Sequence, residues 1–402
     1  MNEWLDPEVG SSVLGLMSYL DSNNIEKVDD LTVKLHLNSP QIGVPEHLFH
    51  FPSLILNHRT FDGDILRVPV GTGPYTLEEY VDGERAVLRR REDYWDKGVD
   101  GELLPYLDEL RFIDLGEEQS ALVAGFEGGQ VDAFNPDDIQ YAIALQNNPD
   151  AVVSSVTSGD VRLLRMRVDR APWDDNRVRM AFKLCQDRDK IRQLAHMGEG
   201  ILGEDHHIAA VYPAYFDMDT PAYDPERAKE LLVEAGYPDG LDVTIVVSSG
   251  WVDTVSYAEI LKEDSAPAGF RLNIEPVPTS VYWDQWTEID LGITPWSHRP
   301  LETMVLQLAY TLDGDGNPGA WNETRWHDEE FQSLLDEAEM TFDVDERREI
   351  IGKIQKIQQE RGPIGVAFWR DRFLVFKRGL ENTNAHPSNF YDFREAYWKE
   401  DE

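Results

Sequence analysis

Polar and apolar residues alternate in several short stretches of the first 135 residues, a pattern that is typical of half-buried strands. The stretches are residues 27–37, 68–95 and 107–114. In the second of these, Asp82-Gly83 indicates a hairpin turn between two strands. Residues 119–128 predict a helix and residues 131–134 an extended segment. This part of the chain is therefore predicted to hold short strands joined by turns, with one helix.

Helices and strands alternate from about residue 177 onward. Residues 178–194 are amphipathic and follow Asp174 and Asp175, which predicts one helix with an acidic cap. A second helix is predicted between Asp224, which can cap it, and Gly236, which fits the left-handed position after its end. The remaining predicted elements are strands at 242–248, 271–277, 290–294 and 364–377, and helices at 253–263, 281–287, 328–340 and 344–361. This alternation predicts βαβ units and a mainly parallel sheet.

The size and composition of the chain favour two folded lobes. Its 402 residues, 41% of them hydrophobic, suffice for two separate cores. The single cysteine, Cys185, allows no disulfide within the chain, leaves the redox compartment open, and is interpreted as a small core residue. The sequence contains no run of 18 apolar residues, so no membrane span is predicted. The first residues have neither the positively charged region nor the apolar region of an export signal.

The net charge of −39 comes from 76 Asp and Glu against 37 Lys and Arg. Such a surface repels nucleic acid and anionic membranes, so neither is expected as a partner. Concentrated salt shortens the Debye length to about 3 Å at 1 M and would screen the self-repulsion. We therefore favour a halophilic host; the alternative is an ordinary acidic protein.

Four stretches resemble the family 5 extracellular solute-binding proteins, which are the peptide, nickel and oligosaccharide receptors of ABC importers. They are Pro69–Tyr75 with Arg89–Trp95, Ala171–Arg188, Tyr223–Gly240, and Leu334–Ala338 with the helix that follows. These stretches follow one another in the order and at the spacing typical of the family, over nearly the whole chain. Within this family, Trp296–Leu301, Trp321–Thr324 and Ala385–Pro387 look like a peptide-receptor subgroup that is haloarchaeal-like.

The resemblance implies an α/β, two-lobed periplasmic-binding-protein architecture of type II, in which closure of the lobes captures a peptide-like solute for a membrane permease. The implied domains are residues 1–66, a remnant of an accessory domain; 67–162, lobe I; 163–371, lobe II; and 372–402, a return to lobe I. Members begin with an export signal, often with a lipid-modified cysteine, then the N-terminal part of lobe I and an accessory domain. The chain is therefore expected to be N-terminally truncated, and its full-length form to be an extracellular or surface-anchored monomer.

The predicted ligand-binding residues lie at the exit of the strand at 290–294 and in two further segments. They are Trp296, His298, Arg299, Trp321, Asn322, Glu323 and Tyr75. A tryptophan at the carboxyl end of a strand offers a flat apolar wall, and an arginine offers a fork for a carboxylate. Many family members carry an acid near residue 299, where His298 and Arg299 stand here, so the resemblance implies a ligand with a carboxylate or an oxygen-rich face. The alternative is that these side chains fill the core, pair with lobe acids, cap a helix or pack at the hinge.

Signals for other chemistry are weak. Asp205-His206-His207 lacks a third metal ligand at a fixed spacing, and Gly71-Thr72-Gly73 lacks the lysine of a phosphate loop. The sequence contains no G-x-S-x-G and no H-E-x-x-H motif. We therefore predict a binding protein without metal or cofactor rather than an enzyme. The alternatives are a truncated relic that binds nothing and an extracellular hydrolase; the identity of the solute stays open.

Overall fold

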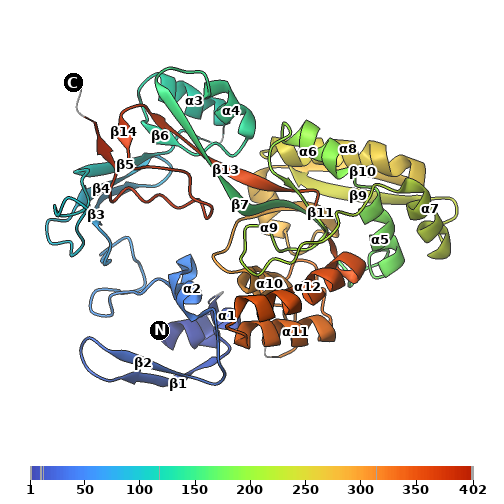
Figure 1. The fold of residues 1–402 in the computed structure, drawn as a ribbon, viewed down its shortest axis with the longest axis horizontal. Coiled ribbons are helices and arrows are strands. Elements are labelled where there is room, and N and C mark those ends of the chain that lie inside the picture. Colours follow the sequence, from blue (N-terminus) through green and yellow to red (C-terminus); the bar gives the residue numbers. More distant parts are fainter. Residues whose placement is uncertain (1, 10, 12, 117, 314, 400–402) are drawn as a thin grey trace. The chain divides into compact units, whose positions relative to one another are not determined.

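The computed structural model describes residues 2–9, 11, 13–116, 118–313 and 315–399. The chain divides into a first unit, Met1–Leu54 with Thr157–Arg370, and a second unit, Ile55–Val156 with Asp371–Glu402. Strands β7 (Ala151–Met166) and β13 (Phe368–Lys377) contribute residues to both (Figure 1). The assignment of segments 1–66, 67–162, 163–371 and 372–402 to an accessory domain and two lobes stays a prediction, and positions 1, 10, 12, 117, 314 and 400–402 of it lie outside the described residues.

The N-terminal segment of the first unit forms a small cluster around a hairpin. Its elements are η1 (Asn2–Leu5), η2 (Pro7–Val9), α1 (Val13–Leu16), β1 (Leu20–Lys27), β2 (Val33–Leu37), α2 (Val44–Phe49) and η3 (Phe51–Ser53). The strand signature over 27–37 with its turn-like Asp29-Asp30 corresponds to β2 and to the reversal before it, where β1 and β2 pair antiparallel. The Asp29 carboxylate accepts from the Leu31 amide at 2.7 Å, and such Asx turns reverse the chain.

The sheet of the first unit is mixed. Strand β9 (Leu241–Ser248) pairs in parallel with both β10 (Phe270–Val277) and β11 (Leu291–Trp296). The predicted parallel sheet holds for these three strands only, because β11 pairs antiparallel with β7. Two short strands, β12 (Ile364–Gly365) and β8 (Ile201–Leu202), pair antiparallel with β7 and β13.

Helices form two layers on the sheet of the first unit (Figure 1). The helices and 3-10 turns are α5 (Asn176–Leu184), α6 (Arg188–Ala195), α7 (Pro225–Glu234), α8 (Val252–Ser265), η4 (Ala266–Ala268), α9 (Thr279–Gln285), α10 (Glu302–Tyr310), α11 (Glu329–Met340) and α12 (Val344–Arg361). Successive side chains of a strand point to opposite faces. Accordingly, Leu164 and Met166 of β7 pack in the core with α5–α8, whereas Val161 and Leu163 pack in the core with α10–α12.

The single helix predicted over 178–194 is two helices, α5 and α6. Helix α5 ends before the buried Cys185. Asp187 then caps α6, because its carboxylate accepts from the Lys190 amide at 3.1 Å. The prediction for α7 is confirmed: the Asp224 carboxylate accepts from the Arg227 amide, and Gly236 has φ +96°.

The second unit combines a three-stranded sheet with the far end of β13. Its elements are β3 (Tyr75–Val81), β4 (Arg85–Arg90), β5 (Glu109–Ile113), α3 (Gln119–Glu127), β6 (Ala133–Phe134), α4 (Ile139–Leu145), β14 (Leu380–Glu381) and β15 (Tyr397–Trp398). The three-stranded sheet has the order β3-β4-β5, and β6 pairs antiparallel with β13. No helix among the described residues of the chain is long and apolar enough to span a bilayer.

Candidate functional site

Trp296 ends β11 and lies in the core of the first unit. Its side chain is 4% exposed, and its indole N–H donates to Glu323 Oε1 at 2.7 Å. The Trp321 ring lies 6.0 Å away and the His207 ring 5.2 Å away, centroid to centroid. Trp296 therefore has a core contact and a hydrogen-bond partner in this structure, and its contact with a ligand stays a prediction.

His298 is held by residues in the middle of β7 and by Tyr212. Its ring stacks on Tyr212 with centroids 5.2 Å apart, and its Nδ1 accepts from the Gly159 amide at 3.0 Å. Its own amide donates to the Asp160 carboxylate at 2.8 Å. Because Nδ1 accepts an N–H, this nitrogen carries no proton, so the ring is the neutral tautomer with its proton on Nε2.

Arg299 is partly buried and lies over the Trp321 ring, with its guanidinium carbon 5.5 Å from the ring centroid. Its Nη1 donates to the carbonyls of Ser297 at 3.1 Å and His298 at 3.4 Å. Its Nε is buried and has no acceptor within the part of the chain that the structure describes. Burial lowers the pKa of the Arg299 guanidinium.

The Tyr212 hydroxyl fixes the backbone at Arg299. It donates to the Arg299 carbonyl at 2.8 Å, and the Arg299 amide lies 3.3 Å from the same oxygen. Gly159 lies beside this pair: a Cβ there would come within 2.9 Å of the Tyr212 hydroxyl and 3.0 Å of His298 Nδ1. Glycine at this position therefore makes room for the stack of His298 on Tyr212.

Asn322 and Glu323 are interior residues. The Glu323 carboxylate pairs with Arg165 at 3.1 Å and accepts from the Thr294 hydroxyl at 2.7 Å, in addition to Trp296. Burial raises the pKa of Glu323, and Arg165 opposes that rise. The Asn322 amide donates to the Trp326 carbonyl at 3.0 Å. Both side chains thus support the loop that carries Trp321, and their contact with a ligand stays a prediction.

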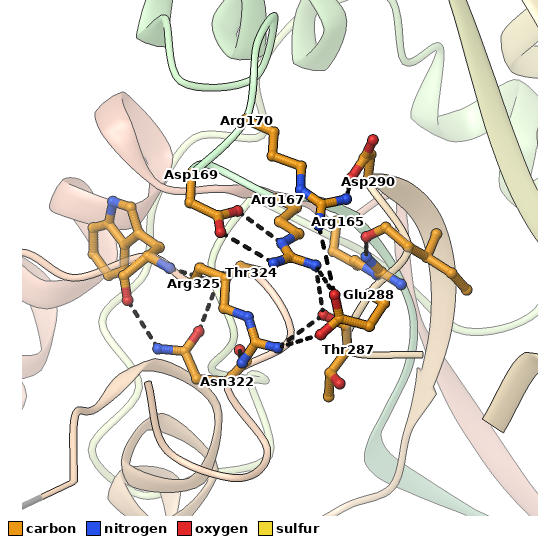
Figure 2. Close-up of polar contacts among 12 residues, drawn as sticks. Arg165, Arg167, Asp169, Arg170, Thr287, Glu288, Asp290, Asn322, Thr324 and Arg325 are labelled. Atoms are coloured by element: carbon orange, nitrogen blue, oxygen red, sulfur yellow. Dashed lines mark hydrogen bonds and ion pairs between the residues drawn. The ribbon is translucent and has the colours of Figure 1, made fainter. Parts of the chain in front are cut away.

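Ion pairs connect the loop that carries Trp321 to the residues that follow β7 (Figure 2). Arg167 pairs with Asp169 at 2.7 Å and with Glu288 at 2.7 Å, and Arg325 reaches the same Glu288 at 3.0 Å. The Thr324 carbonyl accepts from the Val168 amide at 2.9 Å. The loop is therefore held by ion pairs and a backbone hydrogen bond as well as by the side chains of Asn322 and Glu323.

Tyr75, the remaining predicted site residue, belongs to the second unit. It begins β3, and its buried hydroxyl has no hydrogen-bond partner among the described residues. Burial raises the pKa of Tyr75 to about 12. Its part in binding stays a prediction.

The three residues considered as a metal site each contact a different neighbour. Asp205 pairs with Arg188 at 2.5 Å, His206 lies 2.8 Å from the Gln355 amide, and His207 Nδ1 lies 2.8 Å from the Tyr310 hydroxyl. No group of three metal-ligating side chains occurs in the described ranges.

Sequence reasoning missed Tyr212, Arg165 and Asp160. The last two lie on β7, which the sequence analysis does not predict. The β-branched residues of 152–157 are a signal that favours a strand there. Tyr212 lies in a loop and carries no such signal.

Two curated relatives match most of this chain at low identity. Heme-binding protein A of Haemophilus influenzae is 24% identical over 359 residues, covering 85% of this chain and 63% of the relative. Di/tripeptide-binding protein 1 of Pseudomonas aeruginosa is 25% identical over 405 residues, covering 94% of this chain and 72% of the relative. The chain thus spans about two thirds of the length of these two proteins.

A solved structure and a family model also match most of the chain. The periplasmic binding protein DppA of Helicobacter pylori, solved with the peptide STSA, superposes with a TM-score of 0.85 at 20% identity, over 100% of this chain and 80% of that one. This likeness confirms the predicted α/β type II periplasmic-binding-protein fold. The model of the "Bacterial extracellular solute-binding proteins, family 5 Middle" matches residues 1–317. Because the family model matches well over half of this chain, the chain belongs to the family 5 bacterial extracellular solute-binding proteins.

Proposed function

We propose that this chain is the solute-binding component of an ABC importer and that its solute is peptide-like and carries a carboxylate. Family membership supports the receptor role. The single observation that supports the carboxylate is Arg299, a partly buried guanidinium over an aromatic ring without an acidic partner among the described residues.

The hydrogen bonds of the Arg299 guanidinium go to carbonyls only, and the charge of Asp160 acts on it without an ion pair. Of the 76 Asp and Glu, none within the described ranges forms an ion pair with it. Burying a guanidinium without a counter-charge is unfavourable, and a bound carboxylate would restore the missing interaction. The Trp321 ring beneath it provides an apolar surface for the neighbouring part of the solute.

A peptide-like solute fits this chemistry. A peptide ends in a carboxylate that an arginine fork binds with two parallel hydrogen bonds. The relative from Pseudomonas aeruginosa is named for binding di- and tripeptides, which supports the same class here. In this proposal Trp296, His298, Asn322, Glu323 and Tyr75 complete or support the site.

The test is a calorimetric comparison of tripeptides with a free carboxylate and the same tripeptides as amides. Native protein is expected to bind the free acids more tightly. Arg299→Gln removes the charge and the fork, so it should weaken binding of the acids by about 10- to 100-fold and leave the amides nearly unchanged. Arg299→Lys keeps the charge without the fork, so its affinity for the acids should lie between those of the native protein and of Arg299→Gln.

The matched control is Arg227→Gln on α7, an exposed arginine that pairs with Glu230 and Glu234. It should bind like the native chain. Equal affinity for acids and amides in the native protein, or an Arg299→Gln variant that binds both as the native chain does, would contradict a carboxylate at Arg299.

We further propose that the protein binds its solute without turning it over, and that its full-length form is exported, anchored at the cell surface and monomeric in a halophilic host. The family consists of binding proteins. The charge of −39 supports a salt-rich environment. A relic that binds nothing is the competing proposal, and the calorimetric experiment separates the two.

A further inference from the structure

A buried histidine of the N-terminal segment lies next to the residues that the proposed function assigns to the solute. His50 follows α2 and precedes η3, and it is 5% exposed. Its ring meets the Trp321 ring edge to face, with centroids 6.3 Å apart and planes at 71°. The Arg299 guanidinium lies over the same indole ring, 5.5 Å from its centroid. His50 and Arg299 are therefore neighbours of one tryptophan, although they come from distant parts of the sequence.

Both side chains have a buried nitrogen without a hydrogen bond. His50 Nε2 has no hydrogen-bond partner within the described part of the chain, and Arg299 Nε is in the same condition. Burying a polar atom unpaired is unfavourable, and buried polar atoms of folded proteins are nearly always paired. Two such nitrogens beside the Trp321 ring therefore indicate a ligand that both of them bind.

The charges around His50 select the kind of ligand. Burial lowers the pKa of His50 to about 4, and the positive charge of Arg299 contributes to this shift. The ring is therefore neutral at pH 7 and carries one N–H. The groups whose charges act on it are Arg299 and His47, and neither is an acid. An N–H beside a guanidinium suits a negatively charged acceptor, and a carboxylate at Nε2 selects the tautomer with its proton on this nitrogen.

A second buried histidine near Arg299 is placed differently. The charge of Arg299 also lowers the pKa of His207, and His207 Nε2 is likewise unpartnered among the residues that the structure describes. Its ring contacts three aromatic rings of the core, those of Trp296, Tyr310 and Trp369. These contacts enclose His207 in the core, whereas His50 contacts Trp321 itself.

Backbone contacts fix the position of His50. The Ser53 amide donates to the His50 carbonyl at 2.8 Å, and the Ser53 hydroxyl donates to the His47 carbonyl at 2.6 Å. Earlier in the same segment, the Ile42 amide donates to the Glu339 carbonyl of α11 at 2.9 Å. A donor that is held in place before binding loses little conformational entropy when a ligand arrives.

We propose that His50 is a further ligand-binding residue of the Arg299 site, and that its Nε2–H and the Arg299 guanidinium donate to the oxygens of one carboxylate. This inference rests on the proposed function and extends it. It assigns part of the specificity for an acid to residues 41–53, which contain no predicted site residue. A peptide amide offers a single oxygen and no negative charge, so the two donors together favour the acid.

The experiment uses the tripeptide acid that native protein binds most tightly in the calorimetric comparison above, together with its amide. His50→Leu removes both ring nitrogens and should weaken binding of the acid about 10- to 100-fold, because a hydrogen bond to a charged group is lost. Binding of the amide should weaken less, because its hydrogen bond is between neutral groups. The preference of the protein for the acid over the amide should therefore fall.

Two polar variants separate the N–H of His50 from its ring. His50→Gln keeps an N–H donor near the position of Nε2 and should bind the acid within about threefold of the native protein. His50→Asn carries its amide near the position of Nδ1 and should lose the preference for the acid as His50→Leu does. Equal affinity of these two variants for the acid, whether reduced or native-like, would overturn the proposal. Should His50→Leu fail to fold, this pair decides.

The matched control is His47→Leu on α2. His47 is also buried, but its Nδ1 lies 3.1 Å from the Tyr19 hydroxyl, and the charge of Arg299 is not among the causes that lower its pKa. This variant should melt at a lower temperature and keep the native preference for the acid. A loss of preference equal to that of His50→Leu would contradict a direct contact between His50 and the carboxylate.

Arg299→Gln, measured beside these variants, separates a failure of this inference from a failure of the proposed function. If Arg299→Gln loses the preference for the acid and His50→Leu keeps it, the carboxylate site stands and His50 is not part of it. If the native protein binds the acid and the amide equally, the proposed function and this inference both fail.

Discussion

Glu323, one of the predicted ligand-binding residues, has a structural role in the interior of the first unit. Its side chain is 1% exposed and joins Arg165, Thr294 and Trp296. Breaking a buried ion pair leaves the remaining charge uncompensated, at about 3–5 kcal/mol. We therefore predict that Glu323→Gln lowers the free energy of unfolding by about that amount in chemical denaturation.

A matched control for this variant lies nearby on the surface. Glu288 also accepts from arginines, Arg167 and Arg325, but is exposed to solvent. Glu288→Gln should change stability little, because water screens the pair. If the two variants unfold at the same denaturant concentration, the buried pair is not what holds this loop.

The buried carboxyl of Glu339 makes the stability of the folded protein decrease as pH rises. Burial raises the pKa of its carboxyl from 4.5 to about 8, and the Gln41 amide donates to it at 3.2 Å. Between these two pH values the folded state holds a proton that the unfolded state has released, so the contribution of Glu339 to stability is present below pH 4.5 and is lost as pH rises toward 8. Glu339→Gln cannot lose that proton.

The variant Glu339→Gln should therefore gain stability relative to the native chain as pH rises, by up to about 1.4 kcal/mol per pH unit. Thermal or denaturant unfolding of both proteins at several pH values between 4.5 and 8 measures this difference. A difference that stays constant over the range would show that Glu339 ionises normally in the folded protein.

At the scale of elements, helix α12 depends on its N-terminal cap. The Asp343 carboxylate accepts from the amides of Asp345 and Glu346, both at 3.0 Å. Asp343→Ala leaves these amides without a protein acceptor and should lower the free energy of unfolding by about 1 kcal/mol. Glu349→Ala, at an exposed position of the same helix, should have little effect; an equal loss in both variants would argue against capping.

Elements with complete local signals were predictable from the sequence. The hairpin of β3 and β4 has Asp82-Gly83 at its turn, and α7 has both its cap and its terminal glycine. The split between α5 and α6 was missed, because the cap at Asp187 interrupts a continuous apolar period. Helix α10 was also missed: it is buried nearly all round and therefore lacks an amphipathic pattern.

At the candidate site, the sequence points to residues but not to the contacts between them. Arg299 and Trp321 were singled out separately, and the structure stacks them although 22 positions separate them in the chain. The interior positions of Asn322 and Glu323 depend on Arg165 and Trp326, which are tertiary partners that no local pattern reveals. Tyr75 lies in the other unit, and its role stays a prediction.

For the whole molecule, the net charge of −39 predicts a dependence on salt. Exposed like charges repel one another, and salt screens this repulsion by shortening the Debye length to about 3 Å at 1 M. The melting temperature should therefore rise steadily with KCl from about 0.1 M into the molar range. Sucrose at matched osmolality should produce a smaller rise, and full stability at low salt would contradict a salt-adapted surface.

We propose that this protein binds a carboxylate-bearing peptide and releases it unchanged. Mass spectrometry under non-denaturing conditions, after incubation with a tripeptide library, tests it most directly. We predict a one-to-one complex from which acid releases an intact peptide, and its loss in Arg299→Gln. A chain that binds no peptide, or peptides recovered as cleavage products, would contradict the account.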